Sequence, residues 1–254
     1  MNNNQLSGPI PHSIGYMKQL QNINLEYNQL SGPIPESIGK LGNLMELYLS
    51  YNQLSGPIPK SIGKLGYLTV LDLRGNQLSG PLPELIGKLG DLRELDLGGN
   101  QLSGPIPIPQ LIGNLENLML LELLDLSSNK LSGPIPESIG KLGNLMILML
   151  NSNQLSGHIP DSIGNLGKLR ILSLSNNKLS GSIPKSIRNL NNLEKLYVSG
   201  NKFSCDEIPS SLNPKDCTVT VVSTTTDKKI STTTLISMAI GSVITIGLAF
   251  LLLL

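Results

Sequence analysis

An asparagine recurs nine times along this chain, each time followed two residues later by Leu or Phe, then by Ser and a segment that ends in Ile-Pro or Leu-Pro. Every interval between consecutive members is 24 residues, except for one of 29. A fixed period of this length is typical of a solenoid, in which each repeat buries its apolar face only against its neighbours. Because a stack of near-identical repeats has no unique cleft, the same period argues against an enzyme. The nine residues are Asn4, Asn28, Asn52, Asn76, Asn100, Asn129, Asn153, Asn177 and Asn201.

One repeat, residues 41–65, shows what each unit is expected to contain. The alternation in Leu47-Tyr48-Leu49 predicts a short strand with both leucines facing inward. Asn52 follows where the chain turns away, and its amide can satisfy backbone groups that no strand reaches. Ile58-Pro59 predicts extended chain, and residues 61–65 predict a single 3₁₀ turn. The asparagines expected to form this structural ladder are Asn28, Asn52, Asn76, Asn100, Asn129, Asn153, Asn177 and Asn201.

The full repeat reads L-x-x-L-x-L-x-x-N-x-L-S-G-x-I-P-x-x-I-G-x-L and closely resembles the plant-type leucine-rich repeat, from residue 2 to about residue 212. The resemblance implies an α/β, β-rich fold. This is a right-handed solenoid with a parallel sheet on its concave face, a second short strand from Ser-Gly-x-Ile-Pro, and 3₁₀ turns on the convex side. Members of this subtype mostly form the extracellular parts of receptor-like kinases, receptor-like proteins and polygalacturonase-inhibiting proteins. The resemblance therefore implies a receptor-like module that binds a peptide or protein on its concave face.

Positions that alternate with the inward leucines form columns across the predicted sheet, and these are the candidate ligand-binding residues. The middle of the sheet is acidic, and an exposed apolar patch of Ile147, Met149 and Ile171 is expected toward its C-terminal end. Exposed apolar side chains beside charges are typical of a protein-binding surface. Stacked aspartates raise the alternative of a metal site, but Leu-Asp-Leu is the default filling of this repeat in the family, so no metal is expected. The candidates are Glu46, Tyr48, Asp72, Arg74, Glu94, Asp96, Asp125, Ile147, Met149, Ile171 and Tyr197.

Charge and composition narrow the function further. The formal net charge is +1 and basic residues do not cluster, so nucleic acid is not an expected partner. His12 and His158 stand alone, without a nucleophile or carboxylate at a meaningful spacing. We therefore expect no enzyme activity and no cofactor. The expected partners are a peptide or protein ligand and, through the solenoid or a membrane helix, a co-receptor.

The interval of 29 residues is the one break in the period. It contains an extra Ile-Pro within residues 106–109 and an extra leucine step within residues 115–124. Both insertions flank the expected 3₁₀ turn, so they should bulge outward without breaking the sheet. A partner-specific bump and a tolerated expansion of the outer face both remain as explanations.

The first repeat has neither a signal segment nor a capping sequence before it. A solenoid needs polar caps to cover its terminal core, and here Leu6, Ile10, Ile14 and Met17 are expected on an open face. Three explanations compete: a fragment of a longer protein, a partial gene model, and a partner that covers the end.

The repeats are assigned to residues 1–204, and three further segments follow. Residues 205–217 predict a C-terminal cap, in which Cys205 and Cys217 are expected to form a disulfide, the alternative being two free thiols. Residues 218–234 contain ten Ser or Thr and predict a polar stalk. Residues 235–254 are uncharged and mostly apolar, with the length of a helix that crosses a membrane.

This apolar segment has two interpretations. It is either a removable signal for glycosylphosphatidylinositol attachment or a retained single-pass or tail-anchoring helix. Lys228 and Lys229 favour keeping the repeats on the cytosolic side, whereas the repeat subtype, the cysteine pair and the Thr-rich stalk point outside the cell. We expect a membrane-anchored protein, at the plasma membrane with extracellular repeats. The alternative is a tail-anchored cytosolic scaffold that organises partners at a membrane.

Overall fold

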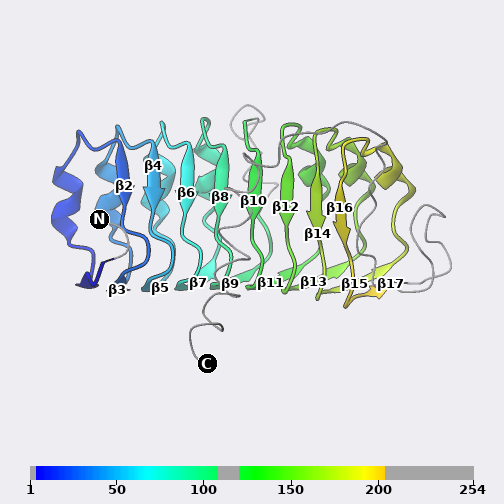
Figure 1. Cartoon of the computed structure of the whole chain (residues 1–254), viewed down its shortest axis with the longest axis horizontal. Helices are drawn as coiled ribbons and strands as arrows, with labels where there is room; N and C mark the ends of the chain where they lie inside the picture. Colours follow the sequence, from blue (N-terminus) through cyan, green and yellow to red (C-terminus); the bar gives the residue numbers. More distant parts are fainter. Residues whose placement is uncertain (1–3, 108–119, 204–254) are drawn as a thin grey trace, which may run out of the picture. The chain divides into compact units, whose positions relative to one another are not determined.

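Two short strands and one 3₁₀ helix recur along the stack in the described residues, except that no helix is described between β9 and β10 (Figure 1). The structure is a computed structural model, and it describes residues 4–107 and 120–203. All of these residues belong to one structural unit, residues 1–223. Among them, the strands form two parallel sheets, one of eight strands and one of nine. The expected arrangement of parallel sheets joined by short 3₁₀ turns is confirmed.

The bounds of the elements repeat with the sequence. The eight-stranded sheet contains β2 (Asn22–Asn24), β4 (Glu46–Tyr48), β6 (Val70–Asp72), β8 (Glu94–Asp96), β10 (Leu123–Asp125), β12 (Ile147–Met149), β14 (Ile171–Ser173) and β16 (Lys195–Tyr197). The nine-stranded sheet contains β1 (Ser7–Gly8), β3 (Gln29–Gly32), β5 (Gln53–Gly56), β7 (Gln77–Pro81), β9 (Gln101–Gly104), β11 (Lys130–Gly133), β13 (Gln154–Gly157), β15 (Lys178–Gly181) and β17 (Lys202–Phe203). The described 3₁₀ helices are η1 (His12–Tyr16), η2 (Glu36–Lys40), η3 (Lys60–Lys64), η4 (Glu84–Lys88), η5 (Glu137–Lys141), η6 (Asp161–Asn165) and η7 (Lys185–Asn189).

The two sheets differ in register. In the eight-stranded sheet, equivalent residues of successive repeats are direct partners, as with Tyr48 and Asp72. In the nine-stranded sheet the pairing is offset by two residues, so Ser31 lies beside Gln53 instead of Ser55. Side chains on the eight-stranded sheet therefore line up in straight columns.

The long interval does not interrupt the eight-stranded sheet. Strand β10, the first element after it, pairs with β8 through Leu123 and Glu94, and with β12 through Leu123 and Ile147. The inserted residues themselves fall largely within 108–119, outside the described residues. The columns of the sheet thus continue across the break in the period.

The core is a ladder of leucines and isoleucines between the two sheets and the 3₁₀ helices. In one repeat, Leu47, Leu49, Leu54, Ile62 and Leu65 are all fully buried. Burial of each such side chain contributes roughly 1.5–3 kcal/mol. Because the described repeats supply equivalent residues, the core continues from one repeat to the next and gives the sheet a rigid support.

The recurring asparagines join the repeats through hydrogen bonds. The Nδ2 group of Asn52 donates to the carbonyl oxygens of Leu25, Leu49 and Ser50 at 2.9, 3.1 and 3.2 Å, and its Oδ1 accepts from the Leu30 N–H at 2.9 Å. Leu25 and Leu30 belong to the preceding repeat, so one side chain fastens two repeats together. Bonds of the same type are made by Asn76, Asn100, Asn129, Asn153, Asn177 and Asn201.

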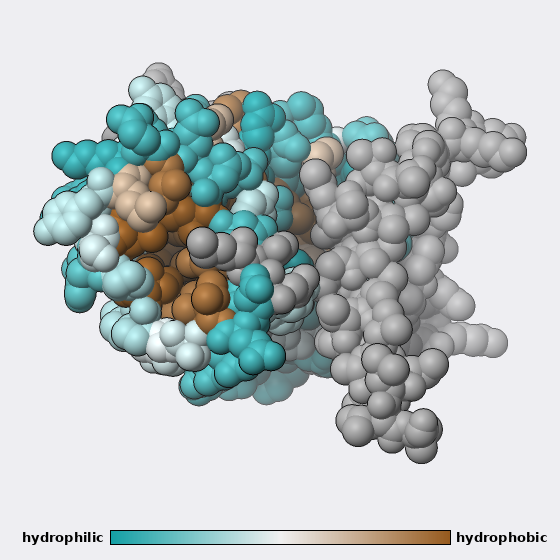
Figure 2. All heavy atoms as spheres, turned by 60° about the vertical axis from the view of Figure 1, so that its left-hand side comes forward, coloured by the Kyte–Doolittle hydropathy of each residue, from teal (hydrophilic) through white to brown (hydrophobic). Residues whose placement is uncertain are grey.

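The two ends of the chain differ in what the structure describes. At the first repeat, Leu6 and Met17 are exposed and Ile14 is half-buried, and Figure 2 shows hydrophobic side chains gathered at this end. Ile10, expected on the open face, is instead buried because it packs into the core cluster.

The predicted cap, the Cys205–Cys217 disulfide, the stalk and the apolar helix over 235–254 lie outside the described residues. Within the described residues, no helix has the length and apolar character needed to cross a membrane.

Candidate ligand-binding face

The outward-facing side chains of the eight-stranded sheet form the candidate site, and we call this surface the outward face. It comprises the first and third residue of each strand and the residue two positions after the strand. Straight register places equivalent positions on neighbouring strands about 4.8 Å apart. The face therefore presents three columns of side chains on a backbone held from below by the leucine core and the asparagine ladder.

Two repeats show that sequence variation concentrates on this face. Residues 30–45 and 131–146 are the same string, LSGPIPESIGKLGNLM. The strands that follow keep their inward leucines, Leu47 and Leu49 against Leu148 and Leu150. Their outward positions all differ: Glu46, Tyr48 and Ser50 in one repeat are Ile147, Met149 and Asn151 in the other. In these two strands, the inward residues are thus the same and the outward residues differ.

The three aspartates of the middle column are buried, although they lie at outward positions. Asp72, Asp96 and Asp125 are only 3%, 4% and 6% exposed, and their Cα atoms are partners on successive strands. Each carboxylate folds back onto its own turn, where Oδ1 accepts the N–H of Arg74, Gly98 or Ser127 at 3.1, 3.0 and 2.8 Å. These aspartates therefore hold the turns beneath the face and are hardly exposed on its surface.

Arg74 is the cation that lies against this column. Its Nε is 3.5 Å from Oδ2 of Asp72, and one of its terminal nitrogens is 3.5 Å from Oδ2 of Asp96. The guanidinium also lies over the ring of Tyr51, 5.3 Å from the ring centre, in a cation–π contact. One side chain thus connects the acidic column to an aromatic group.

Burial changes the acidity of the column. It raises the pKa of Asp72 to about 6, against the opposing effect of Arg74. Burial raises the pKa of Asp96 to about 8, with further contributions from the charges of Asp125 and Asp72. It also raises the pKa of Asp125 and of half-buried Glu94. The column therefore keeps protons at a pH where surface carboxylates are ionised.

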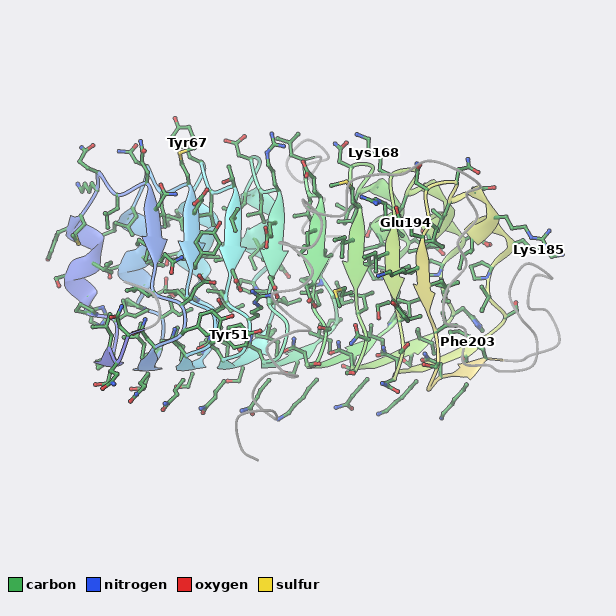
Figure 3. The ribbon with its side chains drawn as sticks, viewed as in Figure 1. Tyr51, Tyr67, Lys168, Lys185, Glu194 and Phe203 are labelled. Carbon is green, nitrogen blue, oxygen red and sulfur yellow. The ribbon has the colours of Figure 1, made fainter. Side chains whose placement is uncertain are left out.

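An aromatic pair that the sequence did not single out lies beside the column. The rings of Tyr27 and Tyr51 stack with centres 4.6 Å apart and an angle of 16°. Both residues have φ of 52°, a region that few non-glycine residues adopt. Figure 3 shows Tyr51 between the strand ends and the nine-stranded sheet. A signal was present in the sequence, because the residue before each ladder asparagine is elsewhere Gly, Ser or Asn.

The polar N-terminal part of the face contains further candidates. Glu46 is half-buried and accepts a hydrogen bond from the side-chain amide of Asn22. Tyr48 is half-buried, and burial, followed by the charge of Glu46, raises its pKa to about 12. The Ser50 hydroxyl donates to Glu26 at 2.7 Å. Glu46 and Tyr48 keep partial exposure, whereas Ser50 is fully buried.

The apolar part of the face is smaller than expected. Ile147 is buried, with 7% exposure, so the prediction of an exposed patch is wrong at this residue. The reason is that Leu123 and Ile171 flank it on the two neighbouring strands. Met149 and Ile171 are half-buried, as is Tyr197 two strands further along from Met149. These three side chains retain surface for apolar contact.

The arrangement suits recognition through many side chains. Within residues 4–107 and 120–203, no three His, Cys, Asp or Glu side chains are placed to hold a metal ion. The aspartates of the column instead bind backbone N–H groups and Arg74. The face offers charged, phenolic and apolar groups along a rigid sheet.

Comparison with known families identifies the repeats. Residues 105–213 match a family described as a leucine-rich repeat region, residues 42–102 match a leucine-rich repeat family, and residues 19–41 and 91–115 match a further one. Together these matches run from residue 19 to residue 213. The chain belongs to the leucine-rich repeat family. No curated protein matches the sequence.

Solved structures place this leucine-rich repeat protein with the plant type. The ectodomain of the Arabidopsis receptor kinase HAESA, in complex with the peptide hormone IDA and the co-receptor SERK1, is 37% identical with a TM-score of 0.75, over 80% of this chain and 33% of that one. The ectodomain of the Arabidopsis thaliana receptor kinase GASSHO1/SCHENGEN3, in complex with CASPARIAN STRIP INTEGRITY FACTOR 2, is 35% identical with a TM-score of 0.72, over 80% and 26%. The chain thus spans a third or less of these ectodomains.

A plant protein of another kind is also similar. A plant ice-binding protein is 30% identical with a TM-score of 0.64, and the match covers 83% of this chain and 74% of that one. The match thus covers a much larger share of the ice-binding protein than of the receptor ectodomains.

Proposed function

We propose that this protein is a receptor-like recognition module without catalytic activity, which binds an extended peptide or a protein segment on its outward face. The observation that carries the proposal is the divergence between the two repeats with the same 16-residue string. They keep every inward leucine and change all three outward positions, at which Glu46, Tyr48, Met149 and Asn151 keep partial exposure. The likeness to ectodomains solved with peptide ligands supports the same function.

The dimensions of the face fit such a ligand. Eight strands at about 4.8 Å spacing give a surface roughly 34 Å wide, which is about ten residues of extended peptide. The polar part would bind through Glu46, Tyr48 and the Tyr51–Arg74 pair, and the apolar part through Met149 and Ile171. A ligand that lies across the strands would therefore carry polar groups at one end and apolar groups at the other.

An array of synthetic peptides of 10 to 20 residues, probed with the labelled full-length protein, tests the proposal. Tyr48→Ala and Met149→Ala should each lower binding to the selected peptides about tenfold or more, since central contact residues often contribute more than 1 kcal/mol. Lys64→Ala, an exposed residue of η3 on a different surface, is the matched control. Equal loss in all three variants, or no loss in the first two, would place the site elsewhere.

We also propose that the module is anchored to the plasma membrane with its repeats outside the cell. The receptor ectodomains to which it is similar support this location. Intact cells that express the full chain would be treated with a membrane-impermeant amine label, and Lys64 and Lys88 should react. Protection of both lysines in intact cells, with labelling after lysis, would favour the cytosolic scaffold instead. Release by phospholipase C would then distinguish a lipid anchor from a retained helix.

Adsorption to ice is a second candidate function. The match to a plant ice-binding protein covers most of that protein, and the nine-stranded sheet offers a regular polar surface. Each of its strands from β3 to β15 carries one exposed Gln or Lys and one half-buried Ser. If ice is the target, the protein should keep ice crystals small in a frozen sucrose solution, and Ser79→Tyr should reduce the effect while Tyr48→Ala should not. Crystal growth equal to that in buffer would exclude this function.

A further inference from the structure

Three buried carboxylates lie one above another on the middle strands of the eight-stranded sheet. Asp72 on β6, Asp96 on β8 and Asp125 on β10 are direct Cα partners, and all three are at least nine-tenths buried. In the part of the chain that the structure describes, Arg74 forms ion pairs with Asp72 and Asp96, and no ion pair reaches Asp125. The column thus holds three acidic groups and one neighbouring cation.

The other groups around the column add negative charge more than they remove it. Glu26, Glu46 and Glu94 face it from the strands and turns on the N-terminal side. The phenols of Tyr27, Tyr48 and Tyr51 lie on the same side, and because the pKa values of Tyr27 and Tyr48 are raised, these two add no charge at neutral pH. On the C-terminal side, the partner of Asp125 on β12 is Met149, which does not titrate. Carboxylates that share a desolvated site cannot all ionise at once without strong repulsion.

We propose that Asp72, Asp96 and Asp125 form a proton-operated element, which holds protons at acidic pH and loosens the turns after β6, β8 and β10 as these protons are lost with rising pH. The turns respond because each aspartate accepts a hydrogen bond from the backbone N–H two residues later. Protons bound to the column remove repulsion and leave these bonds in place. Their loss puts several negative charges where a single guanidinium faces them.

The sign of the pH effect follows from which state binds more protons. In the unfolded chain these aspartates titrate near pH 4, whereas in the folded chain burial raises the pKa of Asp72 to about 6 and of Asp96 to about 8. Between pH 4 and pH 8, the folded state therefore binds more protons than the unfolded state. Stability from the column is complete at acidic pH and is lost as the pH rises from about 4 to about 8.

Thermal unfolding of the full-length protein, followed by circular dichroism at pH 5, 6.5 and 8 and constant ionic strength, tests the proposal. The midpoint temperature of the wild type should fall steadily with pH. In Asp96→Asn, most of that fall should disappear, because the amide oxygen can still accept the Gly98 N–H but the group cannot ionise. Asp161→Asn, at an exposed residue on η6, is the matched control and should keep the wild-type slope.

A midpoint that does not change with pH in the wild type would overturn the proposal, and so would an unchanged slope in Asp96→Asn. Should that variant fail to fold, the wild type labelled with carbon-13 at its Asp carboxyl groups supplies the second measurement. At least two carboxyl resonances should then titrate above pH 5.5. Titration of every Asp carboxyl group below pH 5 would overturn the proposal by itself. Neither measurement needs a ligand, so the result is independent of the recognition function.

Discussion

The side-chain amide of Asn52 lies 2.9 Å from the carbonyl oxygen of Leu25, 27 residues earlier in the chain. The same amide group donates to two carbonyl oxygens of its own repeat. A single buried side chain therefore closes the turn after one strand and ties it to the strand before. This contact recurs along the stack and explains why the period is centred on asparagine.

Asn76→Ala should destabilise the protein, because the buried carbonyl oxygens of Leu49 and Leu73 and the buried Leu54 N–H each lose the hydrogen bond to this side chain. We expect a loss of about 3 kcal/mol, at the upper end of the cost of an unsatisfied buried group. The free energy of unfolding in urea measures it. The adjacent exposed residue supplies the control: Gln77→Ala should change stability by less than about 0.5 kcal/mol. A similar small effect for both variants would contradict the structural role of the ladder.

Gly75→Ala should also destabilise the protein, for two separate reasons. Gly75 has φ of 62°, which L-residues adopt at a cost, and an added Cβ would lie 2.7 Å from the ring of Tyr51. We expect a loss of about 1–3 kcal/mol in urea unfolding. Gly66→Ala, where an added Cβ meets nothing within 4 Å, should be nearly neutral.

The steric part of the Gly75 effect can be isolated with a second substitution. In a Tyr51→Ala background the ring is absent, so Gly75→Ala should cost less than in the wild type. The difference between the two values is the coupling between residue 75 and the ring. A coupling of zero would show that the ring moves aside freely and that the Tyr27–Tyr51 stack is loose.

Arg74→Met should cost more stability at pH 8 than at pH 5. At pH 5 the aspartates beside it keep most of their protons, so the cation offsets little charge. At higher pH they ionise, and without Arg74 the pKa values of Asp72 and Asp96 should rise further, because Arg74 lowers both. Urea unfolding at the two pH values measures the difference. Arg93→Met, which breaks an exposed pair with Glu122, should cost less than about 1 kcal/mol at either pH.

Ile147→Glu should reduce stability, whereas Met149→Glu should be tolerated. Ile147 is buried between two strands and a carboxylate there would lose its hydration, which we expect to cost about 3 kcal/mol. Met149 is half-buried and a glutamate can reach solvent from that position. Urea unfolding of both variants checks the order of the two effects. Equal tolerance would mean that Ile147 is accessible after all, and it would then return to the set of candidate contact residues.

Much of the candidate site follows from the spacing of the sequence alone. The period places Glu46, Tyr48 and Asp72 at outward positions, and the straight register of the sheet makes Tyr48 and Asp72 direct partners as expected. The sequence could not show that Asp72 is buried while Tyr48 keeps partial exposure. That difference depends on the size and reach of side chains from neighbouring repeats, such as Arg74 above the carboxylates.

The sequence by itself determined the repeat, the inward leucines, the asparagine ladder and the order of strands, because a 24-residue period makes each of them a local property of one unit. Only the tertiary structure decided which outward residues are accessible. It buried Asp72, Asp96 and Ile147 and stacked Tyr27 on Tyr51. The physical reason is that the burial of a side chain, and the pKa of a buried carboxyl group, depend on the side chains of neighbouring repeats. Repeats with the same spacing bring different side chains into contact.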